Sequence, residues 1–238
     1  MLKANDLSKR YEDGNLALDH MSLEVKEGEI FCLLGANGAG KTTTINLFLN
    51  FIEPSDGEVL INGIDVTRDP LEAKKHVSYV SENVMLYGNF TARQNLDFFA
   101  KLGGKKNLTK EDYHMYMRKV GLQEEAFEMR LKNFSKGMRQ KLGITIAIIK
   151  DAPNILLDEP TSGLDPKAAA EFVKILKGLR EEGKSILMCT HDIFRAKEIA
   201  DHVGIMKEGR LVMVRTREDF LADDLEKIYL EYMQEAVV

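Results

Sequence analysis

The segment Gly35–Thr42 constrains this chain more than any other feature of its sequence. It reads Gly-Ala-Asn-Gly-Ala-Gly-Lys-Thr, which fits the pattern G-x-x-x-x-G-K-[ST]. An apolar run, Ile30–Leu34, precedes it, and apolar residues at helical spacing follow it from Lys41 to Phe51. The order strand, glycine-rich loop, helix is the context in which this pattern binds phosphate groups, and it disfavours an incidental glycine turn.

Each position of the loop has a chemical role in that prediction. Glycines let backbone N–H groups turn toward phosphate oxygens, and the start of the following helix adds a partial positive charge. Lys41 would reach the β- and γ-phosphates, and Thr42 would offer its hydroxyl to Mg²⁺.

A second predicted strand ends in two consecutive carboxylates. The apolar run Ile155–Leu157 is followed directly by Asp158 and Glu159. Because successive strand residues point to opposite sides, both carboxylates can serve one site only at the end of a strand. Beside a phosphate loop, Asp158 would hold Mg²⁺ through its water, and Glu159 would polarise a water for in-line attack on the γ-phosphoryl group. Taken alone, a strand that ends in Asp-Glu is usually a solvated turn.

Length, charge and cysteine content exclude several other classes of protein. The chain has 238 residues, roughly 1.5 typical domain lengths, which favours one domain with an insertion. Its net charge of -5 provides no global positive field to attract nucleic acid or anionic lipid. Cys32 and Cys189 lie in apolar runs, which indicates reduced residues in core strands and disfavours a disulfide or a metal site.

Hydropathy predicts no membrane-spanning helix. The longest apolar runs, Ile30–Leu34 and Ile144–Ile149, are far shorter than the ~18–20 residues that cross a bilayer. The first fourteen residues contain no apolar core of a secretory signal. We therefore expect a cytoplasmic protein.

The pattern of elements predicts an α/β fold. Residues 2–34 alternate apolar and polar positions between turn dipeptides, which indicates antiparallel strands leading into the buried one. Short strands are expected at Val59–Ile61 and Val77–Val80, and helical windows without a convincing strand run from Thr91 to about Lys150. Ile155–Leu157 and Ser185–Thr190 flank a predicted helix, as in a parallel sheet.

These elements together predict a P-loop NTPase (RecA-like) core with a mainly parallel sheet, an N-terminal antiparallel β subdomain and an inserted α-helical subdomain. A closing hairpin is expected around Glu208-Gly209. We expect a single domain over 1–238, with the core in 1–90 and 151–214, the helical subdomain in 91–150 and a helical tail in 215–238.

An ordered set of motifs narrows the class further. Phe134-Ser135-Lys136-Gly137-Met138-Arg139-Gln140 stands before the Asp158–Glu159 strand, Ser162-Gly163-Leu164-Asp165 follows it, and His191 comes after the next strand. With the phosphate loop, this order resembles the ATP-binding subunit of ABC transporters, from about Leu2 to Val214. The three segments look like the family's signature loop, D-loop and switch histidine.

The resemblance implies a role for each matching residue. It implies that Glu159, His191 and Glu82 act in catalysis. It also implies that Thr42, Asp158 and Glu82 bind Mg²⁺. The residues implied in ATP binding are Tyr11, Gly35, Asn37, Gly38, Ala39, Gly40, Lys41, Thr42, Thr43, Ser135, Gly137 and Asp165.

Some of these residues also have simpler interpretations. Ser135 and Gly137 stand at a helix start, where a hydroxyl and exposed N–H groups meet an anion, and the family implies that this anion is ATP bound to another protomer. Asp165 before Pro166 is a typical helix N-cap, and both roles can hold. Tyr11 would stack on adenine or pack on a neighbouring strand residue, and a lone histidine such as His191 is usually an ordinary surface group.

The sequence departs from the family pattern at two places. Glu82 stands where most members have glutamine, and it places an added negative charge beside the phosphates. Lys136 and Met138 replace the usual glycine and glutamine of the signature loop, a form that looks like the exporter branch with a separate membrane subunit (ABC-2 type). An apolar stripe at Leu225, Ile228, Tyr229 and Tyr232 is similar to the closing helix of that branch, although docking on its own sheet is the favoured explanation.

The resemblance therefore implies an ATPase that energises a transmembrane ABC permease as a homodimer or heterodimer of ATPase subunits, on the inner face of the cell membrane. The region from Glu82 to about Lys101 would touch the permease, unless its aromatics Tyr87 and Phe90 are internal packing. No nucleic-acid partner is expected. A soluble ABC-type ATPase with a regulatory or ribosome-linked role is the alternative. A GTPase or small-molecule kinase is disfavoured, because no Asn-Lys-x-Asp guanine reader occurs.

Overall fold

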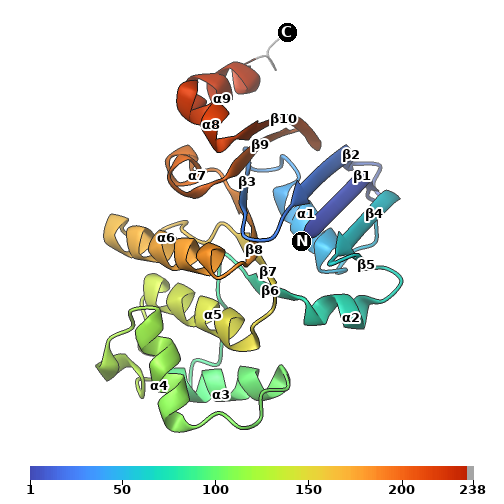
Figure 1. Cartoon of the computed structure of the whole chain (residues 1–238). Helices are drawn as coiled ribbons and strands as arrows, with labels where there is room; N and C mark the ends of the chain where they lie inside the picture. The colour runs from blue at the N-terminus through green and yellow to red at the C-terminus, as the bar shows by residue number, and fades with distance from the viewer. Residues whose placement is uncertain (235–238) are drawn as a thin grey trace.

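An antiparallel sheet forms one side of the computed structural model, which describes residues 1–234 (Figure 1). In the described chain it has four strands in the order β2-β1-β4-β5. Its strands are β1 (Leu2–Arg10), β2 (Leu16–Val25), β4 (Asp56–Ile61) and β5 (Ile64–Asp65). The antiparallel β subdomain predicted from the alternating N-terminal residues is confirmed.

The second sheet has six strands within residues 1–234, in the order β10-β9-β3-β8-β7-β6. All neighbours are parallel except β9 and β10, which form the predicted closing hairpin. Its strands are β3 (Ile30–Leu34), β6 (Val77–Val80), β7 (Asn154–Asp158), β8 (Ser185–Thr190), β9 (His202–Lys207) and β10 (Arg210–Thr216). The two cysteines lie buried and free on β3 and β8.

Helix α1 (Lys41–Phe48) packs between the two sheets (Figure 1). Its side chains Ile45, Leu47 and Phe48 are buried in a hydrophobic cluster shared by residues of both sheets. The helix ends three residues before the predicted Phe51, because the chain turns at Asn50, which adopts a left-handed φ of 50°.

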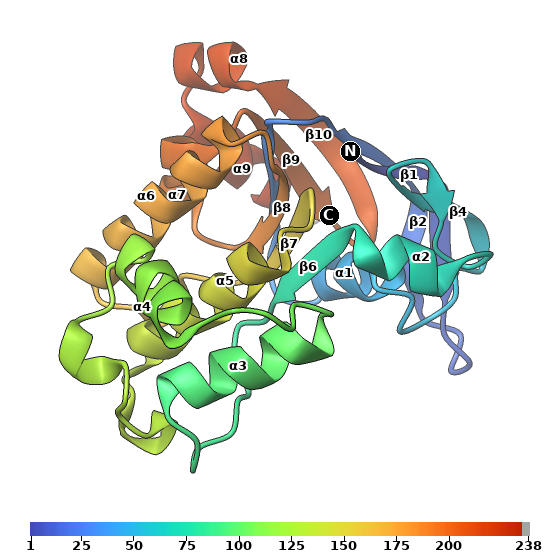
Figure 2. The same cartoon turned by 60° about the horizontal axis from the view of Figure 1, so that its bottom comes forward.

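The segment from 91 to 150 consists of helices and turns. Its helices are α3 (Ala92–Leu102), α4 (Lys110–Lys119) and α5 (Lys136–Lys150), with 3₁₀ turns at Glu124–Ala126 and Leu131–Asn133. Thr91 and Thr109 start α3 and α4 as reciprocal capping boxes, which explains why these helices begin where they do. Helix α5 packs against β6, and α3 and α4 lie on its far side (Figure 2).

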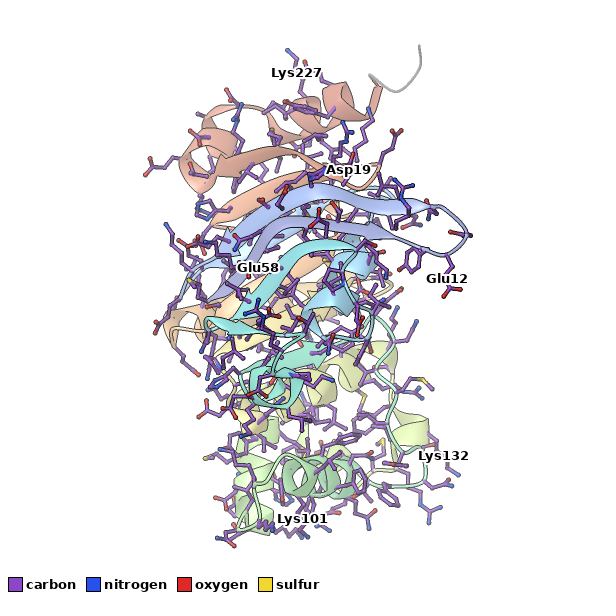
Figure 3. All side chains as sticks on the ribbon, turned by 90° about the vertical axis from the view of Figure 1, so that its right-hand side faces the viewer. Glu12, Asp19, Glu58, Lys101, Lys132 and Lys227 are labelled. Atoms are coloured by element: carbon purple, nitrogen blue, oxygen red, sulfur yellow. The ribbon has the colours of Figure 1, made fainter. Side chains whose placement is uncertain are left out.

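The remaining helices cover the six-stranded sheet and the end of the molecule opposite α3, where Lys227 lies far from Lys101 (Figure 3). They are α2 (Pro70–Lys75), α6 (Pro166–Glu181), α7 (Ile193–Ile199), α8 (Arg217–Ala222) and α9 (Leu225–Gln234). In α9, Leu225 is fully buried and Tyr229 packs against the core, while Lys197 of α7 pairs with Glu226 at 3.1 Å. The apolar stripe of the tail therefore docks on its own chain. Within residues 1–234, none of the helices has the length and apolar character needed to cross a bilayer.

The close packing of α5 on β6 generates a stability prediction. A Cβ atom added at Gly143 would lie 2.9 Å from Val84 Cγ2 and 3.3 Å from Val80 Cγ1. We expect Gly143→Leu to lower the free energy of unfolding by about 1–3 kcal/mol through overpacking, measured by urea denaturation. Gly178→Ala on α6 is the matched control, since its added Cβ would have no neighbour within 4 Å. It should raise stability by ~0.5–1 kcal/mol. Equal effects of the two substitutions would contradict this packing argument.

Candidate active site

A cavity of about 610 Å³ opens beside the phosphate loop. The ends of β6 and β7 also border it, as do the turn between β1 and β2 and the turn between β9 and β10. This size is within the range of small-molecule sites. It is lined by Tyr11, Asn15, Leu16, Ala17, Ala36, Asn37, Gly38, Gly40, Lys41, Thr42, Thr43, Glu82, Asp158, Glu159, Glu208 and Gly209. Most of the predicted nucleotide-binding residues therefore share one cavity.

The phosphate loop can be built only with glycine at its turn into α1. Gly40 caps this helix with a φ of 107°, and a Cβ atom there would lie 2.6 Å from the carbonyl oxygen of Ala17. Of the predicted loop residues, Gly35 and Ala39 face away from the cavity: a Cβ on Gly35 would meet the Met206 carbonyl at 2.6 Å, and Ala39 is buried in the core.

Lys41 is the single basic residue among the side chains that line the cavity in residues 1–234. Its ammonium donates hydrogen bonds to the carbonyl oxygens of Gly35 at 2.6 Å and Ala36 at 3.1 Å, and its side chain is only 6% exposed. The ammonium is thus held inside its own loop, 3.5 Å from Glu159 Oε1, at the position from which it can turn to a phosphate.

Thr42 and Asp158 offer two hard oxygen donors at one point. The Thr42 hydroxyl donates to Asp158 Oδ2 at 3.3 Å. Burial raises the pKa of the Asp158 carboxyl, and the negative charges of Glu159 and Glu82 add to this effect. A divalent cation would offset that concentration of charge, and oxygen donors of this kind suit Mg²⁺. In residues 1–234 no group of three His, Cys, Asp or Glu side chains is placed to hold a metal ion.

Glu159 leaves the strand in a strained conformation with a φ of 46°. Its N–H donates to the carbonyl of Cys189 at 2.9 Å, and Oε2 lies 2.9 Å from His191 Nδ1. The other carboxylate oxygen, Oε1, is buried and has no hydrogen-bond partner in the described chain. This oxygen lies 3.5 Å from the Lys41 ammonium but accepts no hydrogen bond, so it keeps the acceptor capacity that a base needs in order to bind a water molecule.

Glu82 and Tyr11 approach the cavity from other loops. Glu82 Oε1 accepts a hydrogen bond from the Ser162 hydroxyl at 3.0 Å. The ring of Tyr11 is partly exposed, with the Lys9 ammonium 5.4 Å from its centroid. Lys9 thus covers one face of the ring, and the exposed part of the ring can stack on a planar group at the mouth of the cavity.

Besides Gly35 and Ala39, four predicted residues are not part of the cavity lining: His191, which contacts Glu159, and Ser135, Gly137 and Asp165 at two helix starts. Ser135 caps α5 by accepting the N–H of Met138 at 3.2 Å, and Asp165 caps α6 by accepting the N–H of Ala168 at 2.9 Å. The capping role considered for Asp165 is therefore present. The two helix starts are close together, because a Cβ on Gly137 would lie 3.2 Å from the Cβ of Ala168.

Sequence reasoning missed several residues and contacts of this region. Asn15, Leu16, Ala17 and Glu208 line the cavity, although their turn dipeptides were the only signal they gave. Gln140 is buried, and its side-chain amide donates to the carbonyls of Ser81 at 3.2 Å and Glu82 at 2.6 Å. Helix α5 thereby holds the backbone of the loop that carries Glu82.

Comparisons with known proteins agree with this geometry. The model of the ABC transporter family matches residues 18–162. The bacitracin transport ATP-binding protein BcrA of Bacillus licheniformis is 36% identical over 98% of this chain and 74% of its own length. The uncharacterized ABC transporter ATP-binding protein YhcH of Bacillus subtilis is 34% identical over 93% of this chain and 72% of its own.

Solved structures give the same result. The ATP-binding subunit of an ABC transporter superposes with a TM-score of 0.82 at 30% identity, over 97% of this chain and 98% of that one. A dimeric ATP-binding cassette in a post-hydrolysis state with ADP and Pi has the same TM-score at 27% identity, over 91% of this chain and 99% of that one. The chain belongs to the ABC transporter family. It has the cassette fold and is an ATPase, the ATP-binding subunit of a transporter.

Lys41 lies within the phosphate loop, whereas Glu159 lies at the end of β7 beside His191, so we expect the two residues to affect ATP binding and turnover differently. Lys41→Ala removes the cation of the cavity and should weaken ATP affinity about 10- to 100-fold, the effect of losing hydrogen bonds to a charged group. Glu159→Gln keeps the shape of the side chain but not its basicity, so ATP affinity should persist while kcat falls about 10²- to 10⁴-fold. Equilibrium ATP titration and phosphate release distinguish the two. Turnover of Glu159→Gln near the parent rate would exclude Glu159 as the base.

Proposed function

We propose that this chain energises a separate transmembrane permease, as one of two ATPase subunits that close head to tail on a pair of ATP molecules. One observation carries the proposal. In residues 1–234 the cavity is lined by one lysine against the four carboxylates Glu82, Asp158, Glu159 and Glu208. A triphosphate adds more negative charge, so Mg²⁺ and a further positive group must complete the site.

The start of α5 supplies such a group, though not to its own cavity. Ser135 and Gly137 lie outside the cavity of the same chain, at a helix N-terminus that favours an anion. In a head-to-tail pair this helix start would face the γ-phosphate of ATP bound by the other subunit. The relative solved as a dimer with ADP and Pi is a precedent for the pair.

Within the completed site the residues would divide the work. Lys41 and the loop N–H groups would bind the β- and γ-phosphates, Tyr11 would stack on adenine, and Thr42, Asp158 and Glu82 would hold Mg²⁺, which supplies charge neutralisation when bound. Glu159 would accept the proton of the attacking water. His191, 2.9 Å from Glu159 Oε2, would orient that carboxylate and contact the γ-phosphate. Asp165 would act at the junction between the two subunits.

The surface that would contact the permease is an aromatic patch formed by Tyr87, Phe90 and Phe98. These side chains are 48%, 39% and 38% exposed, and the Tyr87 ring lies 5.1 Å from Phe90 and 5.0 Å from Phe98. The buried side chain of Asn95 holds Tyr87 by accepting its N–H at 2.9 Å and donating to its carbonyl at 3.1 Å. An ordered, exposed aromatic cluster is typical of an interaction site.

The exporter direction and the inner membrane face belong to the same proposal. The Ser-Lys-Gly-Met-Arg-Gln form of the signature segment supports an exporter. The relative BcrA is named for bacitracin transport, which agrees with a transporter subunit. The choline transport ATP-binding protein OpuBA of Bacillus subtilis is also 32% identical, over 98% of this chain and 62% of its own length. Relatives of similar identity are thus named for different substrates, so we assign the choice of substrate to the permease.

Pairing of two chains on ATP is tested with Glu159→Gln, because this variant should bind ATP but hydrolyse it very slowly. Light scattering on the Glu159→Gln chain should give the mass of one chain without nucleotide and of two chains with ATP and Mg²⁺. Adding Lys41→Ala should abolish the shift. A mass of one chain at saturating ATP would contradict the paired mechanism.

Contact with a permease is tested by co-purification in mild detergent. The parent chain should bring down an integral membrane protein, and Tyr87→Ser with Phe98→Ser should release it while ATP affinity stays unchanged. Phe51→Ser is the matched control, because Phe51 is 63% exposed and lies outside the patch. If the patch variant retains the membrane protein, another surface makes the contact. Capture of ribosomes instead would favour the soluble ATPase.

A further inference from the structure

The carboxylate of Glu82 is held by two groups that come from different parts of the chain. The Ser162 hydroxyl donates to Glu82 Oε1 at 3.0 Å, and the Lys136 ammonium lies 3.7 Å from the same oxygen. Glu82 belongs to the loop after β6, Lys136 is the first residue of α5, and Ser162 lies between β7 and α6. One carboxylate oxygen therefore joins two loops and the start of α5.

Lys136 reaches Glu82 because the residue that its side chain passes over, Gly163, has no side chain. A Cβ atom on Gly163 would lie 3.2 Å from Lys136 Nζ, 3.6 Å from its Cδ and 3.9 Å from its Cε. The hydrocarbon stem of Lys136 thus passes over the backbone of Gly163, and the ammonium continues to Glu82. The Lys136 side chain is 36% exposed and that of Glu82 43%, so solvent screens the pair and its contribution to stability is small.

The charge balance of the cavity gives the pair a more specific consequence. Glu82 is one of four carboxylates that line the cavity, and Lys41 alone opposes them there in residues 1–234. Lys136 lies outside the cavity lining but beside the Glu82 oxygen, where its charge reduces the negative potential that a phosphate meets. Gln140, on the same helix, fixes the backbone of Glu82 through its carbonyl. Helix α5 thus controls both the backbone and the carboxylate of Glu82.

We propose that Lys136 is a positioning residue that holds the Glu82 carboxylate at Ser162 and offsets its charge toward bound ATP. The inference rests on the proposed function, because it concerns the same nucleotide cavity. Any movement of α5 relative to the six-stranded sheet would move Lys136 away from Glu82 and return the full carboxylate charge to the cavity. The position of the helical segment would then change the electrostatic potential at the bound phosphates.

A double-mutant cycle on ATP affinity tests this pair. Affinity is measured by titration calorimetry on the full chain, with EDTA present so that no metal contributes. Lys136→Met should weaken ATP binding about two- to fivefold, the scale of a partly exposed ion pair. In the Glu82→Gln background the same substitution should change affinity less than about 1.5-fold. The difference between backgrounds should shrink when salt is raised to about 0.5 M.

Matched variants separate charge from structure. Lys136→Arg keeps the charge and should bind ATP as the parent does, whereas Lys136→Gln, a second uncharged variant, should reproduce the loss. Lys132→Met removes an exposed ammonium four residues earlier (Figure 3) and should have no effect. Equal losses in both Glu82 backgrounds would show that Lys136 acts independently of Glu82, and no loss in either would show that the pair does not influence the cavity. Both results overturn the inference, whereas absence of ATP binding by the parent would instead overturn the proposed function.

Discussion

The parallel register of β3, β7 and β8 is the constraint on which the rest of the site depends. Leu34 pairs with Thr190, and Asp158 pairs with Cys189, so the three strands end at the same edge of the sheet. The phosphate loop, the Asp158–Glu159 pair and His191 each follow one of these ends. Since parallel strands all leave the sheet in the same direction, residues that are more than a hundred positions apart meet in one cavity.

The same arrangement leaves the cavity electrostatically incomplete. Lys41 donates hydrogen bonds to carbonyls of its own loop, and Glu159 keeps one buried oxygen without a hydrogen bond, 3.5 Å from the Lys41 ammonium. Glu159 also sits in a left-handed conformation, which costs about 1–3 kcal/mol and persists only because the surrounding strands hold it. The fold thus maintains a strained, strongly anionic site that a metal ion and a positive group of a second subunit would stabilise. Under the proposed pairing, this would give the signature segment on α5 a role although it lies outside its own cavity.

Features set by local sequence could be predicted, whereas long-range side-chain contacts could not. Strand β3 was predicted residue for residue, because a short apolar run directly before a phosphate loop indicates a buried strand. Strand β4 was predicted only over its last three residues, Val59–Ile61, and its antiparallel pairing with β1 is a long-range contact that periodicity does not reveal. Helix α2 was missed, although Asp69 before Pro70 is an N-cap with proline at the first position.

The site shows the same division. Thr42 and Asp158 were predicted to share one site, because Asp158 ends a strand and Thr42 directly follows the phosphate loop at the end of another strand. The contact between Glu82 and Lys136 spans 54 positions and joins the loop after β6 to α5, so it depends on how α5 packs on β6. Gln140 was recognised as part of the signature segment, but its contact with the loop that carries Glu82 was not predicted, since its partners are backbone carbonyls.

The most direct test of the central claim, that one chain holds only part of each reaction centre, is the specific ATPase activity of the parent chain measured over a wide range of dilution. The account predicts that activity per chain falls as dilution separates the subunits, and that it is lost where light scattering gives the mass of one chain. Constant activity per chain, at concentrations where only single chains are present, would contradict it.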